Sequence, residues 1–81
     1  MRRAPRTWMA SSASCRSMLT LTALTVLRQE AELAIHVRGA LRNGLTPEQI
    51  AEVFLHTAVY AGMPAVNRAF AVAQRVLAET G

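Results

Sequence analysis

The chain has 81 residues, of which 52% are hydrophobic, and it carries nine arginines and no lysine, for a formal net charge of +4. This length allows one small domain and excludes a second, and a single cysteine excludes an internal disulfide framework. The arginines form no dense stripe, which disfavours nucleic-acid binding. No segment reaches the roughly 18 consecutive apolar residues of a membrane span, and no N-terminal stretch resembles a secretory signal, so we expect a cytoplasmic protein.

Residues 1–15 are rich in arginine and serine and contain no acid. Mitochondrial transit peptides share this composition, but the simpler interpretation is a poorly specified or disordered leader. The folded domain is therefore expected to cover residues 16–81.

The first two segments with helical patterns are residues 17–27 and 30–42. In residues 17–27 leucines recur at helical spacing, although interleaved threonines leave a strand as the alternative. The second segment begins with acids, ends with arginines, and places on its buried face Leu33, Val37, Ala40 and Leu41. It stops at Asn43-Gly44, a typical left-handed C-terminal cap.

Two further helices are predicted after this cap. Thr46, Pro47 and Gln49 supply an N-cap, a first-turn proline and the partner of a capping box, which predicts a helix from residue 47 to about residue 60. Gly62 breaks that helix, and Pro64 opens a last one. The fold class is therefore all-α, a small bundle of about four helices. Because so short a chain buries only roughly 60% of its unfolded surface, we expect oligomerisation to complete the core.

Acid/base groups are organised in one place, the helix predicted over residues 30–42. Glu32 and His36 lie one helical turn apart on the same face, close enough to share a proton or hold one substrate. The structural alternative is a solvated histidine with a weak ion pair. Arg38 points to a different side and suits either a carboxylate ligand or a glutamate of a neighbouring subunit.

A second polar stripe lies on the next predicted helix. His56 follows Glu52 by one turn, and Tyr60 follows His56 by one turn. Solvation or an oligomer contact is the default interpretation of this stripe. The alternative is that Tyr60 lines a pocket near the break at Gly62.

Three stretches carry a wider pattern: RSMLTL from Arg16, ELAIHVRGALRNGLTPEQI from Glu32, and EVFLHTAVYAGMPAVNRAF from Glu52. Together they resemble the carboxymuconolactone decarboxylase family, from residue 16 to the C-terminal end. The resemblance implies an all-helical fold shared with alkylhydroperoxidase D-like proteins, which assemble into closed homo-oligomers, as trimers or hexamers.

The resemblance also implies an activity. This is the decarboxylation of 4-carboxymuconolactone to β-ketoadipate enol-lactone, a step of protocatechuate degradation through the β-ketoadipate pathway. The substrate is a small lactone dicarboxylate, and no metal, organic cofactor, nucleic-acid partner or membrane partner is expected. No cofactor is needed because the departing carboxylate sits on a ring carbon conjugated through a double bond to the lactone carbonyl, which accepts the electrons.

On this resemblance, His36 and Glu32 take the acid/base role, with His36 as proton donor or enolate stabiliser. Substrate binding is assigned to four other side chains: Arg38, Tyr60, His56 and Arg16. Arg16 matches an arginine of the family.

The hydroperoxidase-like branch has two cysteines before the matching histidine, where this chain has Gln29 and Glu32. Disulfide chemistry needs a pair of thiols, and Cys15 is the only cysteine, so the sequence disfavours peroxide reduction by that route. Two alternatives stay open. One is a truncated, non-catalytic helical oligomerisation module, since residues 1–15 replace a helical stretch usual in the family. The other is a related hydroperoxidase-like enzyme without the cysteine pair.

Overall fold

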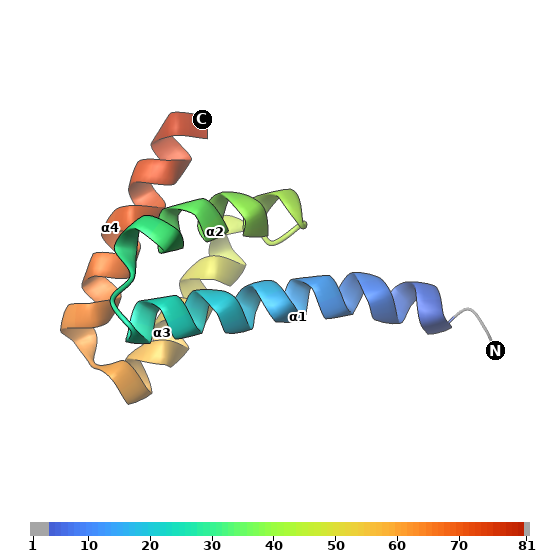
Figure 1. The fold of residues 1–81 in the computed structure, drawn as a ribbon, viewed down its shortest axis with the longest axis horizontal. Coiled ribbons are helices and arrows are strands. Elements are labelled where there is room, and N and C mark those ends of the chain that lie inside the picture. Colours follow the sequence, from blue (N-terminus) through green and yellow to red (C-terminus); the bar gives the residue numbers. More distant parts are fainter. Residues whose placement is uncertain (1–3, 81) are drawn as a thin grey trace.

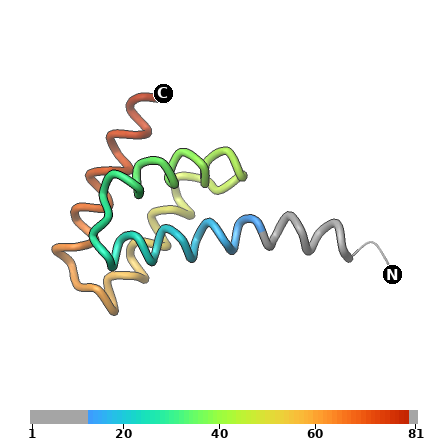
Figure 2. Tube along the Cα trace, in the orientation of Figure 1, coloured from blue at the N-terminus to red at the C-terminus, as the bar shows by residue number. Residues whose placement is uncertain are grey.

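The computed structural model describes the backbone of residues 4–80 and the side chains of residues 13–79. Within these residues it contains four helices and no strand: α1 (Ala4–Val26), α2 (Glu30–Arg42), α3 (Pro47–Ala61) and α4 (Met63–Thr80) (Figure 1). Helices α2 and α3 each pack against both α1 and α4. Short turns join consecutive helices, as the trace in Figure 2 shows. The predicted all-α fold of about four helices is confirmed.

Helix α1 is longer than the helix predicted over residues 17–27. It crosses the expected start of the domain at residue 16 without a break, because no glycine or proline follows Pro5 in this stretch. A domain boundary at residue 16 therefore stays a prediction. The strand alternative was wrong, because a helix accommodates these threonines: the Thr25 hydroxyl donates to the Leu21 carbonyl oxygen at 2.7 Å.

The turn between α1 and α2 is closed by an arginine in the left-handed region. Arg28 has a φ of 61°, and its N–H bonds the Thr25 carbonyl at 3.2 Å. The N–H of Gln29 bonds the Leu24 carbonyl at 3.0 Å, which completes a Schellman motif. A side chain at this φ is strained, because its Cβ approaches the following carbonyl oxygen.

The turn between α2 and α3 contains the left-handed cap that the sequence predicted at Asn43-Gly44. Gly44 has a φ of 98°, its N–H bonds the Leu41 carbonyl, and the N–H of the buried Leu45 bonds the Ala40 carbonyl at 3.0 Å. This is a second Schellman motif, here with the glycine that the conformation favours. The capping box at Thr46 and Gln49 is present as predicted, with both reciprocal bonds formed.

The core lies between all four helices. Phe54 of α3 is fully buried and meets Phe70 of α4 edge to face, with ring centroids 5.3 Å apart. On α2 the expected face is buried at Leu33, Val37 and Ala40, and Leu41 packs at its margin. The core therefore uses one side of α2, and the polar residues of this helix lie on its other sides together with the exposed Ile35.

Replacing Arg28 by glycine should raise the free energy of unfolding by about 1 kcal/mol, because glycine removes the Cβ conflict at positive φ. Arg28→Ala is the charge control, since it removes the guanidinium and retains the strain. Gly44→Ala should lower stability by a similar amount at the equivalent position of the next turn. Urea unfolding followed by circular dichroism measures all three. Equal stability of the glycine and alanine variants at residue 28 would show that the turn carries no backbone strain.

Candidate functional site

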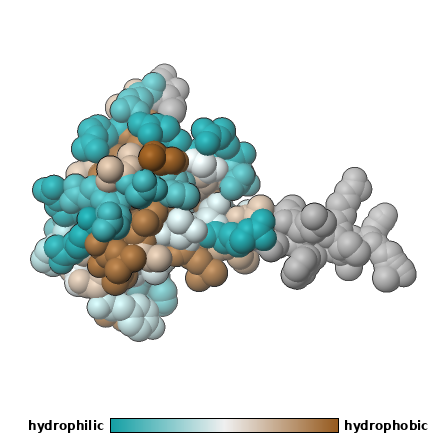
Figure 3. Space-filling view, viewed as in Figure 1, coloured by the Kyte–Doolittle hydropathy of each residue, from teal (hydrophilic) through white to brown (hydrophobic). Residues whose placement is uncertain are grey.

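A polar hollow of about 250 Å³ lies between α1 and α2. Its lining residues recur at helical spacing on the facing sides of the two helices: Ala13, Arg16, Ser17 and Thr20 on α1, and His36, Gly39, Ala40 and Asn43 on α2. Small side chains on both helices leave the space, and the surface between α1 and α2 is pale, of near-neutral hydropathy, in Figure 3. The hollow therefore has room for a small molecule, and it offers hydrogen-bond donors from an arginine and from uncharged serine, threonine and asparagine side chains.

His36 and Glu32 form the expected pair on α2. The distance from His36 Nε2 to Glu32 Oε1 is 3.8 Å, and the two side chains are 47% and 58% exposed. An ion pair this exposed contributes little to stability. The separation of 3.8 Å exceeds a hydrogen-bond distance, and the imidazole lines the hollow with the carboxylate beside it.

Arg16 lines the same hollow from α1. Two of the predicted site residues, Arg16 and His36, thus line one hollow from facing helices, and Glu32 lies beside His36. A guanidinium binds carboxylates through two parallel N–H donors. An anion in the hollow would lie between this guanidinium and an imidazole.

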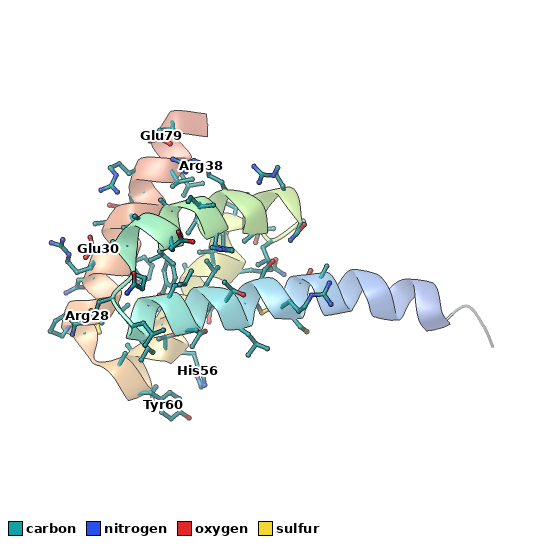
Figure 4. The ribbon with its side chains drawn as sticks, viewed as in Figure 1. Arg28, Glu30, Arg38, His56, Tyr60 and Glu79 are labelled. Carbon is teal, nitrogen blue, oxygen red and sulfur yellow. The ribbon has the colours of Figure 1, made fainter. Side chains whose placement is uncertain are left out.

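Arg38 lies elsewhere on α2. Its Nη2 donates to Glu79 Oε1 of α4 at 2.7 Å, and the two side chains meet near the C-terminal end of α4 in Figure 4. It lines a separate surface depression with Leu41, Arg42 and Leu77. The glutamate that pairs with Arg38 therefore comes from the same chain, and the pair ties α2 to α4.

His56 and Tyr60 lie on α3, away from His36. Their rings meet edge to face with centroids 5.8 Å apart, and both project outward in Figure 4. His56 lines a different depression, between α1 and α3, with Leu19, Thr22 and Glu52 among its neighbours. Tyr60 is 79% exposed. The structure does not bring these two residues together with the Glu32–His36 pair.

The start of α2 is tied to α4 by a bidentate pair. Arg68 donates to both carboxylate oxygens of Glu30, at 2.7 and 3.0 Å. These hydrogen bonds, with the attraction of nearby guanidinium groups, hold the pKa of Glu30 below its ordinary value of 4.5. The ionised carboxylate lies outside the hollow and links α2 to α4 at the surface.

The other cavities offer less chemistry. A crevice between α2, α3 and α4 is lined by apolar side chains such as Ile50, Phe54 and Leu77, with Gln74 as its polar member. Cys15 is exposed and unpaired with another cysteine. Among the described residues, no three histidine, cysteine or acidic side chains are placed to hold a metal ion, and no helix is long and apolar enough to cross a bilayer.

Sequence reasoning missed three polar residues of the hollow: Ser17, Thr20 and Asn43. The pattern of residues 17–27 indicated a hydrophobic repeat and gave no sign of a binding role for Ser17 or Thr20. Asn43 was predicted only as part of the cap that ends the helix. Ser17 and Thr20 are three residues apart on one face of α1, as are His36 and Gly39 on α2. Matching these two stripes would have required knowing that α1 and α2 pack against each other.

Comparison with known proteins places this arrangement in a family. Residues 7–75 match the carboxymuconolactone decarboxylase family, so the match begins before residue 16. Over 66 residues the chain is 39% identical to 4-carboxymuconolactone decarboxylase of Acinetobacter baylyi, covering 82% of this chain and 49% of that protein. Over 62 residues it is 42% identical to a nitrosuccinic acid decarboxylase of Metarhizium robertsii, covering 76% and 43%.

A third relative is an uncharacterized 15.0 kDa protein of Paracoccus denitrificans, 39% identical over 69 residues, which are 83% of this chain and 52% of that protein. The chain spans about half the length of the curated relatives it matches. The family match nevertheless includes every residue that lines the hollow and all of the core cluster except Val76. The chain belongs to the carboxymuconolactone decarboxylase family.

Proposed function

We propose that the hollow between α1 and α2 removes carbon dioxide from a small lactone dicarboxylate of the 4-carboxymuconolactone type. The observation that carries the proposal is the convergence of Arg16 and His36 on one polar hollow, with Glu32 beside His36 on α2. Two relatives support the reaction class, because both are named decarboxylases of small carboxylic acids. Placement in protocatechuate degradation belongs to the same proposal.

The proposed step needs one binding group and one proton donor. The bond between the ring carbon and its carboxylate breaks, and carbon dioxide leaves. The electron pair moves through the ring double bond onto the lactone carbonyl oxygen and forms a dienolate. A proton then adds to the ring carbon beside that carbonyl, which gives the enol-lactone, and the donor regains a proton from solvent.

The residues of the hollow divide these tasks by their chemistry. Arg16 holds a substrate carboxylate, because guanidinium donors match its two oxygens. His36, as imidazolium, delivers the proton, and Glu32 orients the ring. Arg38, His56 and Tyr60 lie outside the hollow and take no part in this step.

Two competing hypotheses make different predictions. A non-catalytic helical module would bind no lactone and show no turnover. A hydroperoxidase-like enzyme would consume peroxide, and the absence of a thiol pair in the sequence argues against the disulfide route. Incubation of the chain with lactone and with peroxide separates the three.

We further propose that the chain forms a homo-oligomer. Large apolar side chains lie exposed on α1, on α3 and at the turn before α2, including Leu19, Leu27 and Val59 at 64–71% exposure. Brown hydrophobic surface gathers over the C-terminal half of α1 and the following turn in Figure 3. Burial of such side chains between copies would add to the small core. Sedimentation equilibrium would give the number of copies.

His36→Ala should lower kcat for lactone decarboxylation by about 10²–10⁴, because general-acid catalysis contributes a factor of that size. Glu32→Gln should cause a smaller loss, since it weakens only the orientation of the ring. Arg75→Ala, on the exposed face of α4, is the control and should retain wild-type turnover. Release of carbon dioxide measures all three. Unchanged turnover in His36→Ala, or a larger loss in His56→Ala, would place the reaction elsewhere.

Gly39→Ala should separate stability from activity. The added Cβ meets only Arg42 Nη2, at 4.0 Å, so the helix accepts it and the free energy of unfolding should rise by about 0.5–1 kcal/mol. The same methyl group occupies space in the hollow, so KM for the lactone should rise several-fold. Ala71→Gly on α4 is the matched control: it should lower stability and leave KM unchanged. A Gly39→Ala variant with wild-type KM would show that substrate does not enter beside α2.

A further inference from the structure

We infer that Ser17 is a substrate-binding donor in the hollow and that Asn43 is the positioning residue that aligns it; this inference rests on the proposed function. One hydrogen bond carries the inference. Asn43 Nδ2, on the C-cap residue of α2, donates to Ser17 Oγ on α1 at 3.1 Å. Both residues line the hollow that Arg16 and His36 also line.

The direction of this bond decides what Ser17 can do. An amide nitrogen only donates, so the Ser17 oxygen is the acceptor. A hydroxyl that accepts through a lone pair still has its own hydrogen to donate. With the oxygen held by Asn43, that hydrogen is available for an acceptor within the hollow, and a carboxylate beside Arg16 is such an acceptor.

The backbone of Asn43 is well suited to hold a side chain in place. Its N–H bonds the carbonyls of Gly39 and Ala40 at 2.9 and 3.1 Å, and the Schellman bonds of Gly44 and Leu45 follow directly. The cap therefore fixes where the amide leaves the helix. In this chain the C-cap of α2 has two tasks: it ends the helix, and it reaches across to α1.

Charge and position favour a carboxylate as the ligand of this donor. Arg16 precedes Ser17 on α1, and Thr20 lies one turn further on the same side of the hollow. A guanidinium and two hydroxyls form an edge of donors along α1, opposite the imidazole of His36 on α2. A dicarboxylate would place one carboxylate on the α1 edge and present its ring to α2.

A double-mutant cycle on binding tests the inference. The probe is the saturated-ring analogue of the lactone dicarboxylate, which lacks the conjugated double bond and therefore keeps its carboxylate. Ser17→Ala should raise Kd for the analogue about tenfold or more, as expected when a hydrogen bond to a charged group is lost. Asn43→Ala should raise Kd in the same direction, and the double variant should bind no worse than Ser17→Ala alone.

Two further variants separate positioning from folding. Ser17→Thr retains the hydroxyl and should restore binding close to that of the wild type. Asn43→Asp has the same shape but accepts the Ser17 proton, so it should bind the analogue more weakly than Asn43→Ala. Asn67→Ala on α4 is the matched control and should leave Kd unchanged. Circular dichroism and the unfolding midpoint identify any variant that fails to fold.

The outcomes distinguish this inference from the proposed function. If wild type binds the analogue and the cycle shows coupling, but the lactone is not decarboxylated, the proposed function fails and the inference stands. If turnover is present and the effects of Ser17→Ala and Asn43→Ala on Kd multiply, Asn43 does not act through Ser17 and the inference is overturned. Absence of analogue binding by wild type overturns both.

Discussion

The site depends on how α2 is held against α1. This helix contributes Leu33 and Val37 to the core and His36 to the hollow, so a rotation about its axis would move both sets at once. Two Schellman turns, at Arg28 and Gly44, set where it starts and stops. Exposed ion pairs to Arg68 and Glu79 of α4 add surface links to this packing, although such pairs contribute little to stability. The packing of α2 is therefore enough to place His36 at the hollow that Arg16 also lines, before any substrate binds.

The constraint also explains why the predicted site residues separate. On a helix held in one rotation, residues one turn apart share a surface, and residues two apart do not. Arg38 therefore faces α4, whereas His36 faces α1. His56 and Tyr60 lie one turn apart on α3, so they share a surface with each other and not with His36. Each of α2 and α3 carries a histidine one turn after a glutamate, and among the described residues only His36 lines a hollow together with an arginine. That difference is the physical ground for proposing that the chemistry takes place beside α2.

Local patterns predicted most of the fold. The capping box at Thr46 and the left-handed Gly44 depend on residues within one turn, so the sequence was enough to locate the C-terminal end of α2 and the start of α3. The left-handed Arg28 could not be predicted in this way, because an arginine carries no signal for that conformation. Equally, the partner of Arg38 and the bond between Ser17 and Asn43 join residues 41 and 26 positions apart. Such pairs follow from packing and not from periodicity.

We propose that the α1–α2 hollow of this chain binds the lactone dicarboxylate. A titration of the isotopically labelled chain with the saturated-ring analogue, followed by amide chemical shifts, tests it directly. If the hollow is the binding site, saturable shifts with one dissociation constant are expected at the residues that line it: Ser17, Thr20, His36 and Asn43. Shifts confined to the surroundings of His56 and Tyr60 on α3, or no shifts at all, would show that the dicarboxylate does not bind between α1 and α2.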